Sequence, residues 1–165
     1  MIFQSFSTNR YRFVNFIELT EEQHMQVWQV RILESVRKYM FNKEVFSFQS
    51  HLAFVEKLKD DKTKLYYAIF DEYDNFLGSI NLHPINYQKK EADWGIYINP
   101  NYQKSGIGQI LANCFFEYIF SFNIIDRITA VVLDFNEQST TFHKRVGFQC
   151  QKNENGQLFF IKERI

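Results

Sequence analysis

Apolar residues recur at intervals of three and one along residues 107–122, which is the most regular pattern in the chain. This spacing places them on one face of a helix. Shorter helical patterns begin after Thr20, which has Gln23 as a capping-box partner, and after Ser47. A further short helix is expected over residues 36–41. The apolar positions of the long helix are Ile107, Ile110, Leu111, Cys114, Phe115, Tyr118, Ile119 and Phe122.

Alternation with a period of two predicts strands elsewhere in the chain. The clearest pair covers residues 65–70 and 76–84 and reads as a hairpin, because turn-forming residues separate the two runs. Further strands are expected at 12–19, 93–98 and 127–133, followed by a helix from Asn136 to near Gly147. A closing antiparallel pair, 148–151 and 158–162, surrounds Asn155-Gly156. Residues 1–165 therefore read as one α+β domain in the order βααβββαβαββ.

The charge balance narrows the classes of partner. The 165 residues carry 19 basic and 19 acidic side chains. No basic surplus favours nucleic acid, and no polybasic or long apolar segment favours a membrane. Cys114 and Cys150 lie far apart, with no metal-ligand spacing. We therefore expect reduced thiols, no metal site and a cytoplasmic protein.

A glycine-rich turn joins the strand at 93–98 to the long helix. Asn99-Pro100-Asn101 break the strand, and the run from Gln103 to Gly108 follows. A strand, a glycine turn and a helix start together aim several backbone N–H groups at one phosphate anion. The turn lacks the Gly-Lys-Ser/Thr of a P-loop and the GxGxxG of a dinucleotide fold, so alone it is a weak signal.

Two sequence motifs together indicate the function of this turn. The first motif has the pattern Q/R-x-x-G-x-G/A and is met by Gln103, Gly106 and Gly108. The second motif begins about 28 residues after the turn and has the pattern N-x-x-A/S-x-x-x-Y-x-x-x-G-F. It is met by Asn136, Ser139, Gly147 and Phe148. This combination resembles the GCN5-related N-acetyltransferase (GNAT) superfamily. The resemblance implies a mixed, mostly antiparallel central sheet of about seven strands. Helices would flank this sheet, and it would be splayed at the strands that bind acetyl-CoA.

The resemblance also implies which residues hold the cosubstrate acetyl-CoA. Backbone N–H groups of the turn would bind its pyrophosphate, and the strand residues Gly95–Ile98 would bind its pantetheine arm. Asn136 of the second motif would contact the cofactor arm. The expected cofactor-binding residues are Ile96, Tyr97, Ile98, Gln103, Lys104, Ser105, Gly106, Ile107, Gly108, Asn136 and Ser139.

The chain departs from the family at the expected general acid. His143 stands where the second motif places a tyrosine that protonates the departing thiolate. Histidine donates protons near neutral pH, so His143 is our candidate acid, with a solvent-facing helix residue as the alternative. Asp93 and Asp134, each near a strand end, are the candidate bases for the attacking amine. Neither cysteine lies in a motif, which favours direct attack by the amine in a ternary complex.

The acceptor site in this superfamily comes from the N-terminal helices and the hairpins. The order of three features along the chain resembles the nucleotide-sugar N-acetyltransferases of pseudaminic acid synthesis. These features are an arginine, a short segment of aromatic residues and methionine, and a helix with the pattern H-L-x-F-[IV]-x-x-L. Those enzymes acetylate UDP-4-amino-4,6-dideoxy-N-acetyl-β-L-altrosamine for flagellin glycosylation. The resemblance implies that phosphates or sugar contact Arg31, Arg37, Lys38, Tyr39 and His51. A solvated helix face is the alternative for Arg37 and Lys38.

Other readings keep part of this picture. A protein N-terminal or polyamine acetyltransferase would share the fold, and a polyamine site would want an acidic cleft. The acidic residues of the N-terminal third are dispersed among basic ones: Glu18, Glu21, Glu22, Glu34 and Glu44. A non-catalytic acyl-CoA-binding module is the third reading, supported by the missing tyrosine. A homodimer is also expected, since many relatives dimerise through sheet edges.

Overall fold

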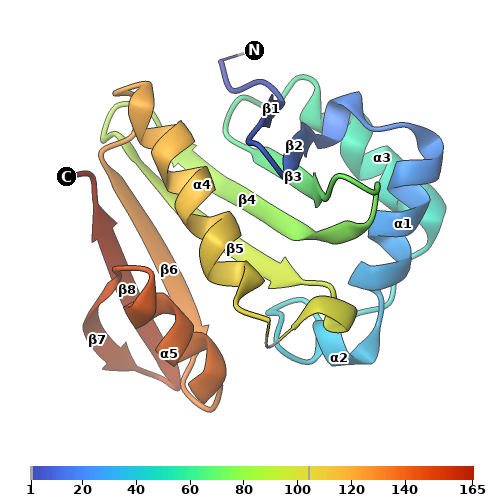
Figure 1. The fold of residues 1–165 in the computed structure, drawn as a ribbon. Coiled ribbons are helices and arrows are strands. Elements are labelled where there is room, and N and C mark those ends of the chain that lie inside the picture. The colour runs from blue at the N-terminus through green and yellow to red at the C-terminus, as the bar shows by residue number, and fades with distance from the viewer. Residues whose placement is uncertain (1, 104) are drawn as a thin grey trace.

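The computed structural model describes residues 2–103 and 105–165, so the expectation for Lys104 lies outside the described residues. These residues form one sheet with helices on both faces (Figure 1). The strands are β1 (Phe6–Ser7), β2 (Arg12–Asn15), β3 (Leu65–Phe70), β4 (Phe76–Asn86), β5 (Glu91–Ile98), β6 (Arg127–Leu133), β7 (Gln149–Glu154) and β8 (Gln157–Glu163). The helices are α1 (Glu21–Arg31), α2 (Glu34–Arg37), α3 (Phe48–Leu58), α4 (Ile107–Ser121) and α5 (Glu137–Arg145), with 3-10 turns at Phe16–Glu18 and Pro100–Tyr102.

The sheet opens at its centre. Its order is β1-β2-β3-β4-β5-β6-β8-β7, which makes eight strands in the described residues, and neighbours run antiparallel except β5 and β6. These two parallel strands pair from Glu91↔Arg127 to Asp93↔Thr129, and within the described chain the ladder ends there. Beyond that point β5 continues to Ile98 and β6 to Leu133, and Figure 1 shows them diverging.

The helices bury two separate apolar clusters on the two faces of the sheet. On one face, α4 packs Phe115 and Ile119 against strand residues that include Trp94. On the other face, Val27 of α1 and Val55 of α3 pack with residues of β3. Burying each large apolar side chain contributes about 1.5–3 kcal/mol. These clusters therefore fix the helices over the two faces of the sheet.

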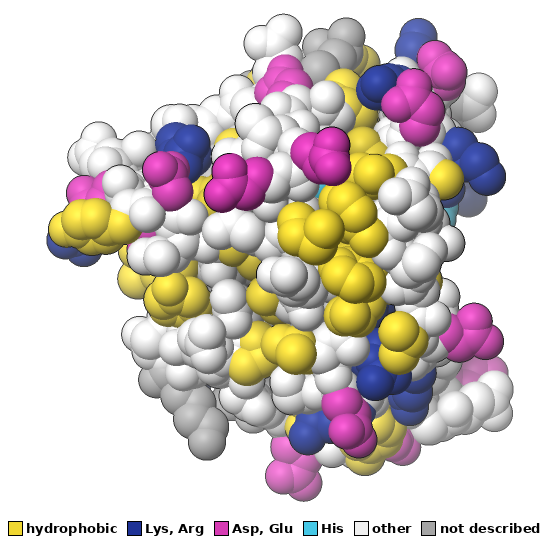
Figure 2. All heavy atoms as spheres, turned by 90° about the vertical axis from the view of Figure 1, so that its right-hand side faces the viewer, with side chains coloured by type: hydrophobic (Ala, Val, Ile, Leu, Met, Phe, Trp, Pro, Cys, Tyr) yellow, Lys and Arg dark blue, Asp and Glu magenta, His cyan; other side chains and the backbone are white. Residues whose placement is uncertain are grey.

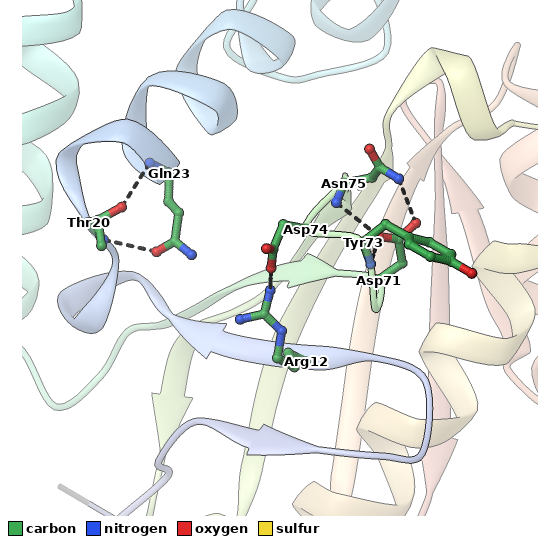
Figure 3. A network of polar contacts seen from close by, with 7 residues as sticks. All are labelled: Arg12, Thr20, Gln23, Asp71, Tyr73, Asp74 and Asn75. Carbon is green, nitrogen blue, oxygen red and sulfur yellow. Dashed lines mark hydrogen bonds and ion pairs between the residues drawn. The ribbon is translucent and has the colours of Figure 1, made fainter.

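Polar side chains set the ends of the elements as the sequence predicts. The Thr20 hydroxyl accepts from the Gln23 backbone N–H, and the Gln23 side chain accepts from the Thr20 N–H in return (Figure 3). Asp71 closes the β3–β4 turn by accepting from the backbone N–H groups of Tyr73 and Asn75. Such caps satisfy donors that the helix or strand leaves unpaired.

The N-terminal third differs from the sequence-based expectation. The strand expected over 12–19 ends at Asn15, because the Asn15 side chain accepts from the Ile17 N–H and starts a 3-10 turn. A short added strand, β1, pairs with β2 and raises the expected seven strands to eight in the described residues. The helix expected over 36–41 is wrong: α2 covers Glu34–Arg37, and the following segment up to Phe46 has no helix or strand.

Apolar side chains gather on the face that carries the N-terminal helices (Figure 2). Exposed large apolar residues of this part of the chain include Leu33, Tyr39, Phe41 and Val45. No helix in the described residues is long and apolar enough to cross a membrane.

Candidate active site

A cleft of about 1150 Å³ runs through the molecule where β5 and β6 part. Its lining comes from the divergent halves of these strands, the start of α4, α5, and the segment from α1 to α3. Residues far apart in the sequence therefore meet at one opening. The opening follows from the early end of the β5–β6 ladder. Beyond that end the strand edges have no ladder partner, so their backbone groups are free to bind a ligand.

The glycine turn forms one end of this cleft. Gly106 is the N-cap of α4 with φ +76° and has no side-chain cap, so the helix presents uncapped backbone N–H groups there. A glycine adopts this left-handed conformation without strain, and a helix N-terminus attracts an anion. Gly108 lies against Phe142, since a Cβ there would be 3.3 Å from its ring. The start of α4 can therefore hold a pyrophosphate against the protein surface.

Most of the residues expected to bind the cofactor line the cleft. Gln103 helps to fix the turn, because its side-chain amide donates to the Ile98 carbonyl at 3.2 Å. Ser105 lies outside the cleft, is exposed, and donates to the Tyr102 carbonyl at 2.6 Å, so its side chain shapes the turn. The expected residues that line the cleft are Ile96, Tyr97, Ile98, Gln103, Gly106, Ile107, Gly108, Asn136 and Ser139.

Asn136 starts α5 at the edge of the same cleft. Its side-chain oxygen accepts from the Ser139 backbone N–H at 3.1 Å. The capping role explains why an asparagine and a helix start coincide there. The motif residues Asn136 and Ser139 thus place the N-terminus of a second helix beside the diverging strands.

Asp93 sits at the point where β5 and β6 separate and lines the cleft. Burial raises the pKa of its carboxyl group to about 6, although a hydrogen bond from the Thr129 hydroxyl at 2.8 Å opposes the rise. A carboxylate with this pKa is ionised at neutral pH and can take a proton from an amine. Asp93 therefore fits the base expected from the sequence.

The competing base is placed elsewhere. Asp134 follows the end of β6, is exposed, and is not among the described residues that line the cleft. Its backbone N–H donates to the Gly156 carbonyl at 2.9 Å in the turn toward β8. The geometry therefore does not support Asp134 as a catalytic residue.

His143 is held on both sides by the protein. The Trp94 indole N–H donates to His143 Nε2 at 3.1 Å, and His143 Nδ1 donates to the Ser139 carbonyl at 2.8 Å. An indole only donates and a carbonyl only accepts, so the neutral tautomer is fixed. Burial also lowers the pKa of this imidazole. The geometry thus argues against the expected acid role, because the only proton of the ring is already donated, and His143 instead joins α5 to β5.

The part of the cleft expected to bind the acceptor is built around Arg31 on α1. Its Nη2 donates to the Asn42 carbonyl at 3.4 Å, and its guanidinium lies 5.7 Å from the centre of the Phe46 ring. Its Nη1 is buried and finds no hydrogen-bond partner among the described residues. Burial lowers the pKa of Arg31, yet a guanidinium stays charged at any pH that proteins meet. Arg31 therefore brings a charged guanidinium to the cleft lining, with one buried donor that has no protein partner among the described residues.

Two of the expected acceptor-binding residues lie outside the cleft. Arg37 donates from Nε to the Ile32 carbonyl at 2.7 Å and from Nη1 to the Lys43 carbonyl at 2.8 Å. It thereby ties the end of α1 to the irregular segment after α2. Lys38 is exposed and lies 4.9 Å from the Tyr39 ring centre. The expected phosphate contacts of Arg37 and Lys38 are therefore not supported, whereas Tyr39 does line the cleft.

His51 is buried and lines the part of the cleft expected to bind the acceptor. Its Nε2 lies 3.0 Å from Nδ1 of His24, a buried residue of α1. Burial, with His24 as a second cause, lowers the pKa of His51 to about 4. His51 is therefore neutral at physiological pH, which the sequence did not indicate.

The sequence reasoning missed a row of polar residues on the sheet. Ser79 and Asn81 of β4 lie opposite Tyr97 and Gly95 of β5, and all four line the cleft together with Asp93. A Cβ on Gly95 would come within 2.7 Å of the Asn81 side-chain oxygen, so the glycine makes room for that amide. The polar residues at alternate positions of β4 were the available signal, because alternate residues share a face.

Known proteins provide the remaining evidence. Residues 14–149 match the family model described as Acetyltransferase (GNAT) domain. The chain is 28% identical over 134 residues to acetyltransferase PseH of Campylobacter jejuni (81% of this chain, 82% of that protein). It is 26% identical over 133 residues to spermidine N(1)-acetyltransferase of Vibrio cholerae (79% and 75%).

The fold agrees with a solved structure. The crystal structure of Campylobacter jejuni PseH in complex with acetyl coenzyme A superposes with a TM-score of 0.76 and 22% identity, and covers 94% of this chain and 99% of that one. The glycine turn, the splayed strands and the second motif agree with the family match. The chain belongs to the GNAT acetyltransferase family and is an acetyl-CoA-dependent N-acetyltransferase.

Proposed function

We propose that the protein acetylates the 4-amino group of a UDP-linked amino-deoxy sugar in pseudaminic acid synthesis, a step toward flagellin glycosylation. The proposed acceptor is UDP-4-amino-4,6-dideoxy-N-acetyl-β-L-altrosamine. The observation that carries the proposal is the Arg31 guanidinium, whose buried Nη1 lacks a partner among the described residues of the acceptor cleft. The relatives named PseH, 26–28% identical over most of the chain, support the same assignment.

A free guanidinium selects among the classes of amine. Leaving a buried charged donor unpaired costs several kcal/mol, so the site favours a ligand that brings an anionic or carbonyl oxygen to Arg31. A diphosphate meets this need through charge-assisted hydrogen bonds. A polyamine brings only cations and would be repelled. The chemistry of Arg31 therefore favours a nucleotide sugar over spermidine.

The acidic residues of the N-terminal third do not assemble into a polyamine site. Of the five glutamates there, Glu44 alone is among the described residues that line the cleft, and it is exposed. Aromatic side chains line the same region instead, namely Tyr39, Phe41 and Phe46. Aromatic faces stack on a base or on the apolar side of a sugar. This composition supports the nucleotide-sugar reading.

The proposed chemistry places Asp93 at the reacting amine. Acetyl-CoA supplies the acetyl group as a thioester, bound by the turn at Gly106 and the free edge of β5. Asp93 takes one proton from the acceptor ammonium, directly or through a water molecule. The amine then attacks the acetyl carbonyl carbon, so that an N–C bond forms and the C–S bond breaks. As the amide forms, its nitrogen loses a second proton, which passes through water to the departing CoA thiolate. This thiolate is a stable leaving group because a thiol has a pKa of about 8.5.

The proposal includes two properties of the whole protein. We place the enzyme in the cytoplasm, where its cosubstrate acetyl-CoA is made. We also propose a homodimer through the sheet edge at β7, a strand whose residues are exposed along its length. A strand edge with free backbone groups pairs readily with another chain. Sedimentation of the full-length protein tests this point, and a monomer at micromolar concentration would contradict it.

An acceptor panel tests the proposed function. Thiol release from acetyl-CoA is followed with the UDP-4-amino sugar, with spermidine and with an N-terminal peptide. The proposal expects kcat/KM for the UDP-sugar to exceed that for spermidine by at least 100-fold, and a product with one added acetyl group. Comparable or faster acetylation of spermidine would contradict the proposal and favour the polyamine reading. Binding of acetyl-CoA without turnover of any amine would favour an acyl-CoA-binding module.

A further inference from the structure

The contact between His24 and His51 joins a core residue to a residue of the cleft. Both side chains are buried, with 5% and 4% of their surface exposed. His24 Nδ1 lies 3.0 Å from His51 Nε2, and only His51 lines the cleft. No hydrogen bond connects His51 Nδ1 to any of the described residues. The remaining nitrogen of His51 is therefore open to a ligand.

A single hydrogen bond joins the two rings, so one ring donates and the other accepts. Burial lowers the pKa of both imidazoles, so each ring is neutral and carries a single N–H. The backbone of Phe16 opposes this lowering in His24, which is the effect of a carbonyl that accepts from the His24 ring. Because Nδ1 of His24 faces His51, we assign the nitrogen that donates to Phe16 as Nε2. His24 Nδ1 must then accept, and the proton between the rings belongs to His51 Nε2.

We propose that His24 is a positioning residue that locks His51 as the Nε2–H tautomer, so that Nδ1 of His51 accepts a hydrogen bond from an N–H or O–H group of the acceptor substrate. This inference rests on the proposed function and specifies one contact within it. A neutral ring that offers a lone pair repels a phosphate oxygen. His51 is thus assigned to a donor group of the nucleotide sugar, in place of the phosphate contact that the sequence suggested, and Arg31 is left as the anion contact.

The tautomer can be measured without any ligand. The four histidines of the full-length protein are labelled with ¹⁵N, and long-range ¹H–¹⁵N spectra report which ring nitrogen carries the proton. The signals of His51 are those that disappear in His51→Asn. The proposal expects a protonated Nε2 and a bare Nδ1 from pH 6 to 8. A protonated Nδ1 on His51, or a ring that titrates in this range, would overturn it.

Kinetics then test whether the lock matters for the acceptor. His24→Phe keeps a flat ring but removes the acceptor, whereas His24→Asn keeps an amide oxygen near the position of Nδ1. Losing one such hydrogen bond corresponds to about a 2- to 10-fold effect. We expect His24→Phe to raise KM for the UDP-sugar by that factor, with KM for acetyl-CoA unchanged, and His24→Asn to restore the wild-type value. The exposed His83, changed to Asn, is the matched control.

The outcomes separate this inference from the proposed function. An unchanged KM in His24→Phe, or equal losses for both substrates in His24→Phe and His24→Asn, would overturn the positioning role. If the wild type does not turn over the UDP-sugar, the proposed function fails, while the spectra still decide the tautomer.

Discussion

Replacing Asp93 with asparagine should make the enzyme slower and, above neutral pH, more stable. The asparagine can still accept the hydrogen bond from the Thr129 hydroxyl, but it cannot take a proton from the amine. General-base help of this kind contributes about 10²–10⁴-fold, and kcat/KM should fall by such a factor. In the wild type, kcat/KM should rise with pH around an inflection near 6, because burial raises the pKa of Asp93 to about 6.

The gain in stability follows from the same raised pKa. Because the folded protein binds this proton more tightly than the unfolded chain, the carboxyl group contributes stability that is fully present below about pH 4 and is lost as the pH rises through about 6. A rise of about 2 units corresponds to at most ~3 kcal/mol. Asp93 retains some solvent access, so about 1–2 kcal/mol is the expected penalty on the wild type at pH 8. Asp93→Asn avoids this penalty.

Thermal and urea unfolding at pH 4 and pH 8 measure this effect. At pH 8 the Tm of Asp93→Asn should exceed that of the wild type by about 2–8 °C, and at pH 4 the two proteins should unfold alike. Asp134→Asn, a change at an exposed position outside the cleft, is the matched control and should leave the activity unaltered. A loss of activity in Asp134→Asn with none in Asp93→Asn would refute the reasoning, as would a wild-type profile without an inflection near pH 6.

Three further substitutions test the site. Arg31→Met should raise KM for the UDP-sugar about 10- to 100-fold and leave KM for acetyl-CoA unchanged, because the proposed phosphate contact and the contacts with Asn42 and Phe46 all lie away from the glycine turn. Steady-state kinetics with each substrate varied measure both constants, and equal changes in the two would contradict this role. His143→Phe should lower the free energy of unfolding in urea by about 2–3 kcal/mol, since the Trp94 indole loses its acceptor. The same change should alter kcat of the folded enzyme less than 3-fold, and a 100-fold loss of kcat would restore the acid role. Gly95→Ala should reduce kcat/KM and lower the free energy of unfolding in urea by about 1–3 kcal/mol, because the new Cβ would come within 2.7 Å of the Asn81 side-chain oxygen. Unchanged activity and stability would show that the Asn81 amide can move away.

Local chemistry explains which parts of the fold were predictable. Thr20, Ser47 and Asn136 each accept from a backbone N–H three residues on, as their sequence contexts predict. The hairpin of β3 and β4 and the long helix α4 follow from apolar periodicity alone. Gly106 takes the left-handed conformation that the glycine turn requires. These features depend on residues close together in the chain, so the sequence carries them.

The parts that failed depend on distant contacts. Asp93 and Asp134 look alike as strand-end carboxylates, and only the point where the β5–β6 ladder ends separates them. The sequence alone suggests a catalytic role for His143. Only the structure shows that the indole of Trp94, 49 positions away, donates a hydrogen bond to its Nε2. Arg37 is a different case, because its partners, the carbonyls of Ile32 and Lys43, lie only five and six positions away, but no periodic pattern marks them. No local pattern reports such partners.

The most direct test of the central claim is the acetyl-transfer rate for two acceptors under matched conditions. Purified wild-type protein, saturating acetyl-CoA and equal concentrations of the UDP-4-amino sugar or spermidine are compared by thiol release, and the product is identified by mass spectrometry. The account predicts rapid release with the UDP-sugar, an acetyl group on its 4-amino nitrogen, and at most a hundredth of that rate with spermidine. Acetylated spermidine at an equal or higher rate would contradict it.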